Sequence, residues 1–194
     1  MTIQLFILAC WIIFALYWML SASFVKPIEK TTGWLSGNWY TLLFLLGYAF
    51  IVGFRPLARL GVAIGFLGSR LIPVSIPLNA VIVSLLSAGL IVAIAARRTL
   101  AGNWSSEVAI KAGHELITSG LYSYVRNPIY AGILIMALGT ALSFGTASAA
   151  IGYLIVVLGV YLKYSDEERI LVRHFGSQYT SYKEHTRALI PFLW

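Results

Sequence analysis

The sequence predicts an all-α fold, a polytopic bundle of helices that span a membrane. Of its 194 residues, 59% are hydrophobic and only 11% are charged, whereas a typical soluble domain carries about 25% charged residues. The apolar residues are concentrated in charge-free runs, each long enough for one or more spans of about 20 residues. These runs cover residues 3–25, 35–54, 72–96 and 128–162. Lipid is therefore expected to solvate much of the surface.

The first run is interpreted as a retained helix rather than a signal peptide. No basic residues precede it, and it exceeds the usual length of about 7–15 residues for the apolar core of a signal peptide. Cys10, the only cysteine of the chain, lies within it. An intrachain disulfide and a thiolate metal cluster are therefore not expected.

The next spans are less regular. A second span is expected to begin near Trp39 and to break at residues 53–56, which contain glycine and proline. The apolar stretch 57–71 is short and interrupted by two arginines. A kinked long helix and a span followed by a re-entrant piece both stay open, so the number of crossings is open by one. A third helix is predicted over residues 78–96. The arginine pair 97–98 follows it and, by the positive-inside rule, places this end in the cytoplasm. We predict five spans with the N-terminus outside.

The second half of the chain begins with a polar stretch. Residues 99–127 are too polar for hydrocarbon and are predicted to form an interfacial loop. Pro128 suits the first turn of a helix, and residues 143–146 have the composition of a turn. A returning helix is predicted from about residue 147 to residue 163. This helical hairpin would bring the residues before its first arm and those after its second arm to one membrane face.

Polar residues gathered at this face are the first indication of function. Charged side chains are costly in lipid, so their position where helices leave the membrane indicates a lined cavity or a water-facing rim. Arg169, Arg173 and Lys183 are typical of an ordinary basic flank. Glu167 and Glu168 are less so, and because neighbours on a helix point about 100° apart, one can face the bundle while the other faces water.

Several other functions lack the residues that they need. The histidines, His114, His174 and His185, have no partner at a ligand spacing, so no metal site is predicted. Glycine-rich nucleotide-binding motifs and the Gly-x-Ser-x-Gly sequence of serine hydrolases do not occur. The net charge of +7 comes from residues between apolar runs, which suits the lipid headgroups of a bilayer rather than a nucleic acid.

The chain is predicted to be a single integral membrane domain. It has no internal repeat and no linker long enough to divide it. Residues 1–98 would supply the N-terminal transmembrane helices, and residues 99–194 would form the polar, chemically equipped half. The oligomeric state is not predicted.

Motifs with a fixed order and spacing run through the second half. Residues 113–132 read GHELITSGLYSYVRNPIYAG, the pair Glu167-Glu168 follows, and residues 175–179 read FGSQY before Tyr182; upstream, residues 102–105 read GNWS. This combination resembles the isoprenylcysteine carboxyl methyltransferase family and its phospholipid methyltransferase relatives. The resemblance covers roughly residues 100–194, while the N-terminal spans agree only in being apolar.

The resemblance implies a transfer of a methyl group from S-adenosylmethionine at the cytosolic face. The acceptor would be a lipophilic small molecule or prenylated group that enters from the bilayer, most simply an isoprenylcysteine-like carboxylate. The cofactor would lie between the C-terminal hairpin and the interfacial loops. The cofactor-binding residues implied are His114, Glu115, Leu116, Ile117, Gly120, Tyr122, Arg126, Asn127, Pro128, Tyr130, Glu167 and Glu168.

The resemblance also assigns roles within this set. Glu167 and Glu168 correspond to the acidic pair expected to hold the amino group of the methionine part of the cofactor. Members of the family often have Arg-His-Pro where this chain has Arg-Asn-Pro at residues 126–128. Asn127 donates and accepts hydrogen bonds but carries no charge and is no base, so it is expected to position the cofactor rather than handle protons.

Two acceptors give the catalytic residues different tasks. A carboxylate needs no general base, and Arg187, with Arg126, would orient it through bidentate bonds. An amine, as in phospholipid N-methylation, must be neutral when it attacks, which would give Glu168 or a tyrosine an acid–base role.

Other functions remain open from the sequence. Residues 186–194 also resemble the ending of membrane steroid reductases, which use a reduced nicotinamide cofactor, although residues 126–128 argue against them. A non-catalytic scaffold or a transporter is a further alternative. A transporter would favour duplicated halves and broken helices near the bilayer midplane, and Arg55-Pro56 is the only such break in the sequence.

Overall fold

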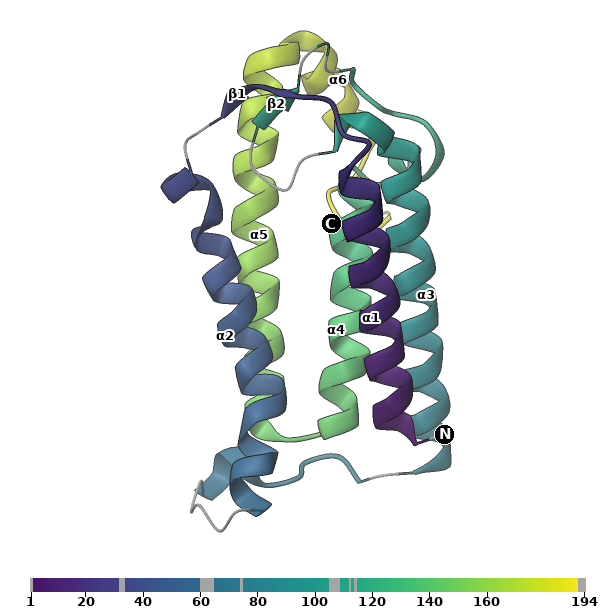
Figure 1. Ribbon diagram of the computed structural model, residues 1–194, viewed down its shortest axis with the longest axis vertical. Coiled ribbons are helices and arrows are strands. Elements are labelled where there is room, and N and C mark those ends of the chain that lie inside the picture. Colours follow the sequence, from purple (N-terminus) through teal and green to yellow (C-terminus); the bar gives the residue numbers. More distant parts are fainter. Residues whose placement is uncertain are drawn as a thin grey trace.

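The computed structural model describes residues 2–31, 34–59, 65–73, 75–104, 109–111, 113 and 115–191. Within these residues, five long helices alternate in direction and a short sixth helix covers one end of the bundle (Figure 1). The predicted all-α membrane bundle is confirmed. The helices are α1 (Ile3–Ala22), α2 (Trp34–Arg59), α3 (Ile76–Leu100), α4 (Pro128–Phe144), α5 (Ala147–Phe175) and α6 (Ser177–His185).

The lengths and compositions of the helices suit a bilayer. In the part of the chain described, three stretches are long and apolar enough to cross a membrane, Ile3–Ala22, Ile76–Asn103 and Ala147–Phe175. The stretch Trp39–Gly53 of α2 and the whole of α4 are apolar but shorter. Many large apolar side chains of α1 are exposed, among them Leu20 at 71%, which is the surface expected of a helix in contact with lipid.

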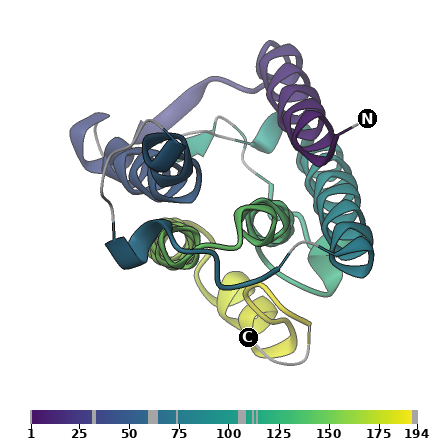
Figure 2. The ribbon, with the colours of Figure 1, turned by 90° about the horizontal axis from the view of Figure 1, so that it is seen from below.

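Two pairs of helices pack closely, α2 with α5 and α3 with α4, and the hairpin of α4 and α5 joins the two pairs. Figure 2 shows α1 beside α3, α2 beside α5, and α4 between α3 and α5. The pairs meet at glycines. A Cβ on Gly152 would lie 2.4 Å from the carbonyl oxygen of Gly47, and a Cβ on Gly89 would lie 2.6 Å from that of Gly132. Small residues permit this close approach of helix backbones, which is typical of membrane helix packing.

The interruption expected at residues 53–56 does not end the helix. The helix α2 continues past residues 53–56 and ends at Arg59. A proline so near the end of a helix disturbs few of its hydrogen bonds, because only the backbone close to that end is affected. The stretch from residue 57 to residue 71 forms no separate crossing in its described part. Instead, the 3-10 turn η1 (Gly65–Gly68) is followed by Leu71, whose N–H donates to the Gly145 carbonyl at 2.7 Å.

The predicted hairpin is present. Its turn uses Gly145 in the left-handed region, at φ 60°, and the side chain of Thr146 caps α5 by accepting from the N–H of Ala149 at 3.2 Å. The helix α5 extends beyond the predicted end to Phe175 and stops at Gly176. Both glutamates at residues 167 and 168 therefore lie on one continuous helix.

A small feature at the same end was not predicted. The strands β1 (Ile28–Thr31) and β2 (Ala109–Lys111) pair antiparallel, with Ile28 opposite Lys111 and Thr31 opposite Ala109. This ribbon joins the connection after α1 to the interfacial loop, near the end of α5 (Figure 1). The loop also contains the 3-10 turns η2 (Ala101–Asn103) and η3 (Gly120–Ser123).

Candidate functional site

A polar cluster lies where the hairpin meets α6, and Arg126 is its centre. The Arg126 Nε donates to Glu168 Oε1 at 2.7 Å, and both side chains are about nine-tenths buried, at 10% and 8% exposure. The Nη1 atom donates to the carbonyl oxygens of Lys183, at 3.3 Å, and Thr186. A guanidinium has five donors in a planar fork, and this one is directed at acceptors from α5, α6 and the tail after α6.

The Glu168 carboxylate has further donors. Lys183 Nζ lies 2.7 Å from Oε2, and Asn127 Nδ2 donates to Oε1 at 3.3 Å and to the Ala188 carbonyl at 3.3 Å. Glu168 thus faces two cations and one amide. A buried carboxylate requires such compensation, because an unpaired charge is costly in a low-dielectric environment.

The backbone holds the same elements together. The N–H groups of Arg126 and Asn127 donate to the carbonyls of Arg187 at 2.8 Å and Ala188 at 3.0 Å. Val125 and Arg187 form a parallel bridge. The tail after α6 is therefore paired with the residues just before α4, and Pro128 begins α4 without a donor at that position.

Glu167, the residue before Glu168, forms its hydrogen bond with a different partner. Tyr130, in the first turn of α4, donates its hydroxyl to Glu167 Oε1 at 2.7 Å. Glu167 is half-buried, while Glu168 is buried with 6% exposure. The two adjacent carboxylates consequently face two sides of one site, as their angular separation on a helix predicts.

Three tyrosines close the cluster on the side of α6. Tyr122 and Tyr179 are buried, and the Tyr182 hydroxyl donates to the Tyr122 carbonyl at 2.6 Å. Burial raises the pKa of Tyr122 and Tyr179 above the ordinary range and raises that of Tyr182 to about 12. These hydroxyls are therefore protonated near neutral pH and do not act as bases there.

Residues 114–117, which the family resemblance places beside the adenosine of the cofactor, are described in part. His114 lies outside the described residues. The Glu115 N–H donates to Asn103 Oδ1 at 3.4 Å, and Ile117 packs against the cluster formed by Ala96, Tyr122 and Ile129. Leu116 is half-buried and Gly120 is exposed, with a left-handed φ of 60°.

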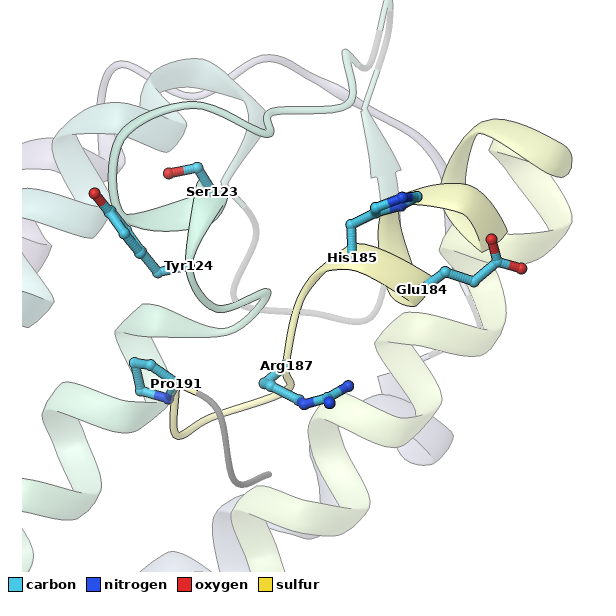
Figure 3. Close-up of a pocket in the computed structure, with 6 residues that line it drawn as sticks. All are labelled: Ser123, Tyr124, Glu184, His185, Arg187 and Pro191. Carbon is cyan, nitrogen blue, oxygen red and sulfur yellow. The ribbon is translucent and has the colours of Figure 1, made fainter.

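Arg187 faces a separate pocket. Its side chain is exposed and lines a pocket of about 250 Å³ together with Ser123, Tyr124, Glu184, His185 and Pro191. Figure 3 shows Ser123 and Tyr124 on one side of this pocket and Glu184, His185 and Arg187 on the other. The Arg126 guanidinium is engaged by Glu168 and two carbonyls, so Arg187 is the better placed of the two for an incoming anion.

The sequence reasoning missed two members of the cluster. Lys183 was assigned to a basic flank, and Thr186 was not considered, yet both contact Arg126 or Glu168. Lys183 follows Tyr179 by four residues, which places both on one face of a helix. That spacing was the available signal, but only the turn at Gly176 directs this face towards α5.

Comparisons with known proteins now bear on the site. Residues 80–173 match the model of the isoprenylcysteine carboxyl methyltransferase (ICMT) family. The resemblance to this family is confirmed. The matched segment contains Arg126, Asn127 and both glutamates of the cluster, and it ends before Lys183 and Arg187.

Curated relatives agree with the family match. The chain is 35% identical over 81 residues to a protein-S-isoprenylcysteine O-methyltransferase of Schizosaccharomyces pombe, and this covers 41% of the chain and 34% of that protein. Over 81 residues it is 33% identical to protein-S-isoprenylcysteine O-methyltransferase B of Arabidopsis thaliana, covering 41% of each. The corresponding human enzyme is 31% identical over 81 residues, 41% of the chain and 28% of that protein. The chain therefore matches less than half the length of these relatives.

Proposed function

We propose that the protein is an S-adenosylmethionine-dependent membrane methyltransferase that O-methylates a lipophilic, isoprenylcysteine-like carboxylate. One observation carries the proposal. Residues that the family resemblance assigns to the cofactor come together around Glu168 at one end of the bundle: Arg126 and Asn127 on Oε1, with Tyr130 on the neighbouring Glu167. The names of the relatives support the reaction and the class of acceptor.

The cluster fits the amino-acid end of this cofactor. That end carries an ammonium and a carboxylate. The cluster offers carboxylates, at Glu167 and Glu168, and cations, at Arg126 and Lys183. Two carboxylates and two cations leave the cluster without net charge, so charge alone does not separate this cofactor from a reduced nicotinamide dinucleotide. The Arg-Asn-Pro sequence at residues 126–128 is what argues against the alternative reductase function.

The arrangement also favours a carboxylate acceptor over an amine. When bound, the cofactor supplies an electrophilic methyl group on a cationic sulfur, which leaves as a neutral thioether. A carboxylate oxygen forms the new bond without losing a proton, so no general base is required. Glu168 is already neutralised by two cations, and Tyr122, Tyr179 and Tyr182 are protonated. None of these four residues is suited to deprotonate an amine.

Two tasks then fall to the residues of this chain. Glu167, Glu168 and Asn127 would hold the cofactor, and Arg187 would bind the acceptor carboxylate in its pocket. In-line attack needs the reacting atoms about 3–3.5 Å apart, and such positioning alone lowers a barrier by several kcal/mol. We place this end of the bundle at the cytoplasmic face, because Arg97 and Arg98 end α3 there.

The proposal is tested by methyl transfer in detergent with a radiolabelled methyl donor. The acceptors are an N-acylated S-prenylcysteine with a free carboxylate, its carboxamide, and phosphatidylethanolamine. We expect base-labile label on the carboxylate only, as a methyl ester. Base-stable label on phosphatidylethanolamine would favour the amine reaction instead. A folded protein that labels none of them would contradict the proposal.

A further inference from the structure

We propose that Lys26, in the N-terminal half, is a positioning residue that holds the interfacial loop at Gly113 and Glu115 in place beside the cofactor site. This inference rests on the proposed function. Lys26 lies outside the segment that matches the family, and neither the motifs nor the comparisons assign it a role.

Lys26 joins the segment after α1 to two places in the interfacial loop, which lies more than 70 residues further along the chain. Its Nζ donates to Asn103 Oδ1 at 3.0 Å and to the Gly113 carbonyl at 2.9 Å, and its backbone N–H donates to the Gly102 carbonyl at 3.0 Å. Asn103 is buried, with 6% exposure, and its Oδ1 also accepts from the N–H of Glu115. One ammonium and one amide oxygen thus connect the segment after α1 to the start of the interfacial loop, at Asn103, and to its middle, at Gly113 and Glu115.

The surrounding backbone is shaped for this contact. A Cβ on Gly102 would lie 3.2 Å from Lys26 Cγ, so a side chain there would displace the lysine stem. Gly113 has a φ of 58°, in the left-handed region that favours glycine. The ribbon of β1 and β2, which begins two residues after Lys26, aligns the same two segments.

A second cation, Arg97, holds the end of α1 next to the start of the interfacial loop. Arg97 is buried and donates to the Ser21 carbonyl at 2.9 Å and the Ala101 carbonyl at 2.7 Å, with its guanidinium 4.5 Å from the centre of the Trp104 ring. The end of α1 is therefore held against η2 independently of Lys26. This leaves Lys26 the narrower task of fixing the loop beyond η2.

The loop leads directly to the polar cluster. Ile117 packs against the buried cluster that contains Tyr122, and the Tyr122 carbonyl accepts a hydrogen bond from the Tyr182 hydroxyl. Tyr182 is in turn bonded through its carbonyl to Thr186, whose own carbonyl accepts from Arg126. A displaced loop would disturb the adenosine side of the site first and the Glu168 side only through these intermediates.

The test compares variants of the full chain in detergent by calorimetric titration with S-adenosylhomocysteine. Lys26→Met keeps the length of the stem but removes the donors, and we expect affinity to fall about tenfold, the loss typical of one charged hydrogen bond. Lys26→Arg should recover part of the affinity. Asn103→Ala should resemble Lys26→Met. Arg98→Met removes an exposed cation at the end of α3 and is the matched control, with unchanged affinity expected.

Two further readouts separate positioning from a general loss of structure. Amide exchange at Gly113 and residues 115–117 should be faster in Lys26→Met than in Arg98→Met, while exchange in α4 and α5 stays unchanged. In the transfer assay, KM for the methyl donor should rise and KM for the acceptor should not. Wild-type affinity and exchange in both Lys26→Met and Asn103→Ala would overturn the inference. A wild type that binds no S-adenosylhomocysteine would overturn the proposed function, and with it the role of Lys26 towards the cofactor.

Discussion

The middle of the bundle and its polar end are held together in different ways. In the middle, α2 approaches α5 at Gly47 and Gly152, and α3 approaches α4 at Gly89 and Gly132, where the helix backbones come close together. At the polar end, Arg126, Glu168 and Lys183 are joined by charge-assisted bonds of 2.7 Å. Packing in the middle depends on the small volume of the glycines, and packing at the polar end depends on the pairing of opposite charges.

Because of this difference, substitutions in the two regions should affect different properties of the protein. A packed apolar interface loses stability when a side chain is enlarged, whatever its chemistry. A buried ionic cluster tolerates small changes of shape but loses much when one charge is removed. Substitutions in the middle should therefore affect unfolding most, and substitutions at the end should affect cofactor binding most.

The largest effect is expected for Gly152→Leu. Its Cβ would lie 2.4 Å from the Gly47 carbonyl oxygen and 2.8 Å from the Ile51 nitrogen, both backbone atoms that cannot move aside cheaply. Overpacking costs about 3 kcal/mol or more in such cases. Thermal unfolding in detergent measures it. Gly53→Leu is the control, because a Cβ there meets nothing within 4 Å; equal loss in both variants would contradict the packing account.

The next effect concerns the charge of the cluster. Arg126→Met leaves Glu168 with one cation, Lys183, and the Asn127 amide, and it leaves the carbonyls of Lys183 and Thr186 without the Arg126 donor. We expect a loss of about 2–3 kcal/mol in the free energy of unfolding and no measurable binding of S-adenosylhomocysteine. Arg126→Lys should not restore binding, because one ammonium lacks the planar fork.

Arg169→Met is the matched control for this experiment. Its partner Asp166 lies at 2.5 Å, but the Arg169 side chain is 72% exposed. The free energy of unfolding of Arg169→Met should therefore stay within about 0.5 kcal/mol of the wild-type value. A similar loss in Arg126→Met and Arg169→Met would show that burial of the Arg126 pair has no special role.

A smaller effect is expected for Tyr130→Phe. The substitution removes the hydroxyl that donates to Glu167 at 2.7 Å and leaves the ring in place. Loss of one such bond weakens binding by about 1–1.5 kcal/mol, or roughly tenfold, which calorimetry with S-adenosylhomocysteine measures. Tyr124→Phe, at an exposed tyrosine, should bind like the wild type. Unchanged affinity in Tyr130→Phe would remove Glu167 and Tyr130 from the proposed site.

The smallest effect appears only at alkaline pH. An unfolded tyrosine ionises at a pKa of about 10, whereas that of Tyr182 is about 12 in the folded protein, chiefly through burial. Between these values the folded state binds more protons, so stability falls as pH rises. The unfolding temperature should decline less steeply from pH 9.5 to 11.5 in Tyr182→Phe than in the wild type. Equal declines of the unfolding temperature in the two proteins would show that folding does not raise the pKa of Tyr182.

The sequence predicted the parts of the site that depend on local rules. Pro128 and the turn at residues 143–146 define the hairpin, and an antiparallel hairpin must bring residue 126 towards residue 168. The position of Lys183 could not be predicted, because it depends on the direction that α6 takes after Gly176. The contacts of Lys26 were also missed, since short strands such as β1 and β2 carry too little pattern to reveal a pairing between distant segments.

Whether the cluster around Glu168 binds the methyl donor is best measured by calorimetric titration with S-adenosylhomocysteine. The wild type, Glu167→Ala and Asn127→Ala are compared in detergent, with a reduced nicotinamide dinucleotide as the control ligand. We expect S-adenosylhomocysteine to bind the wild type, both variants to lose most of this affinity, and the control ligand not to bind. A folded wild type that binds the nicotinamide cofactor and not S-adenosylhomocysteine would contradict this expectation and favour a reductase.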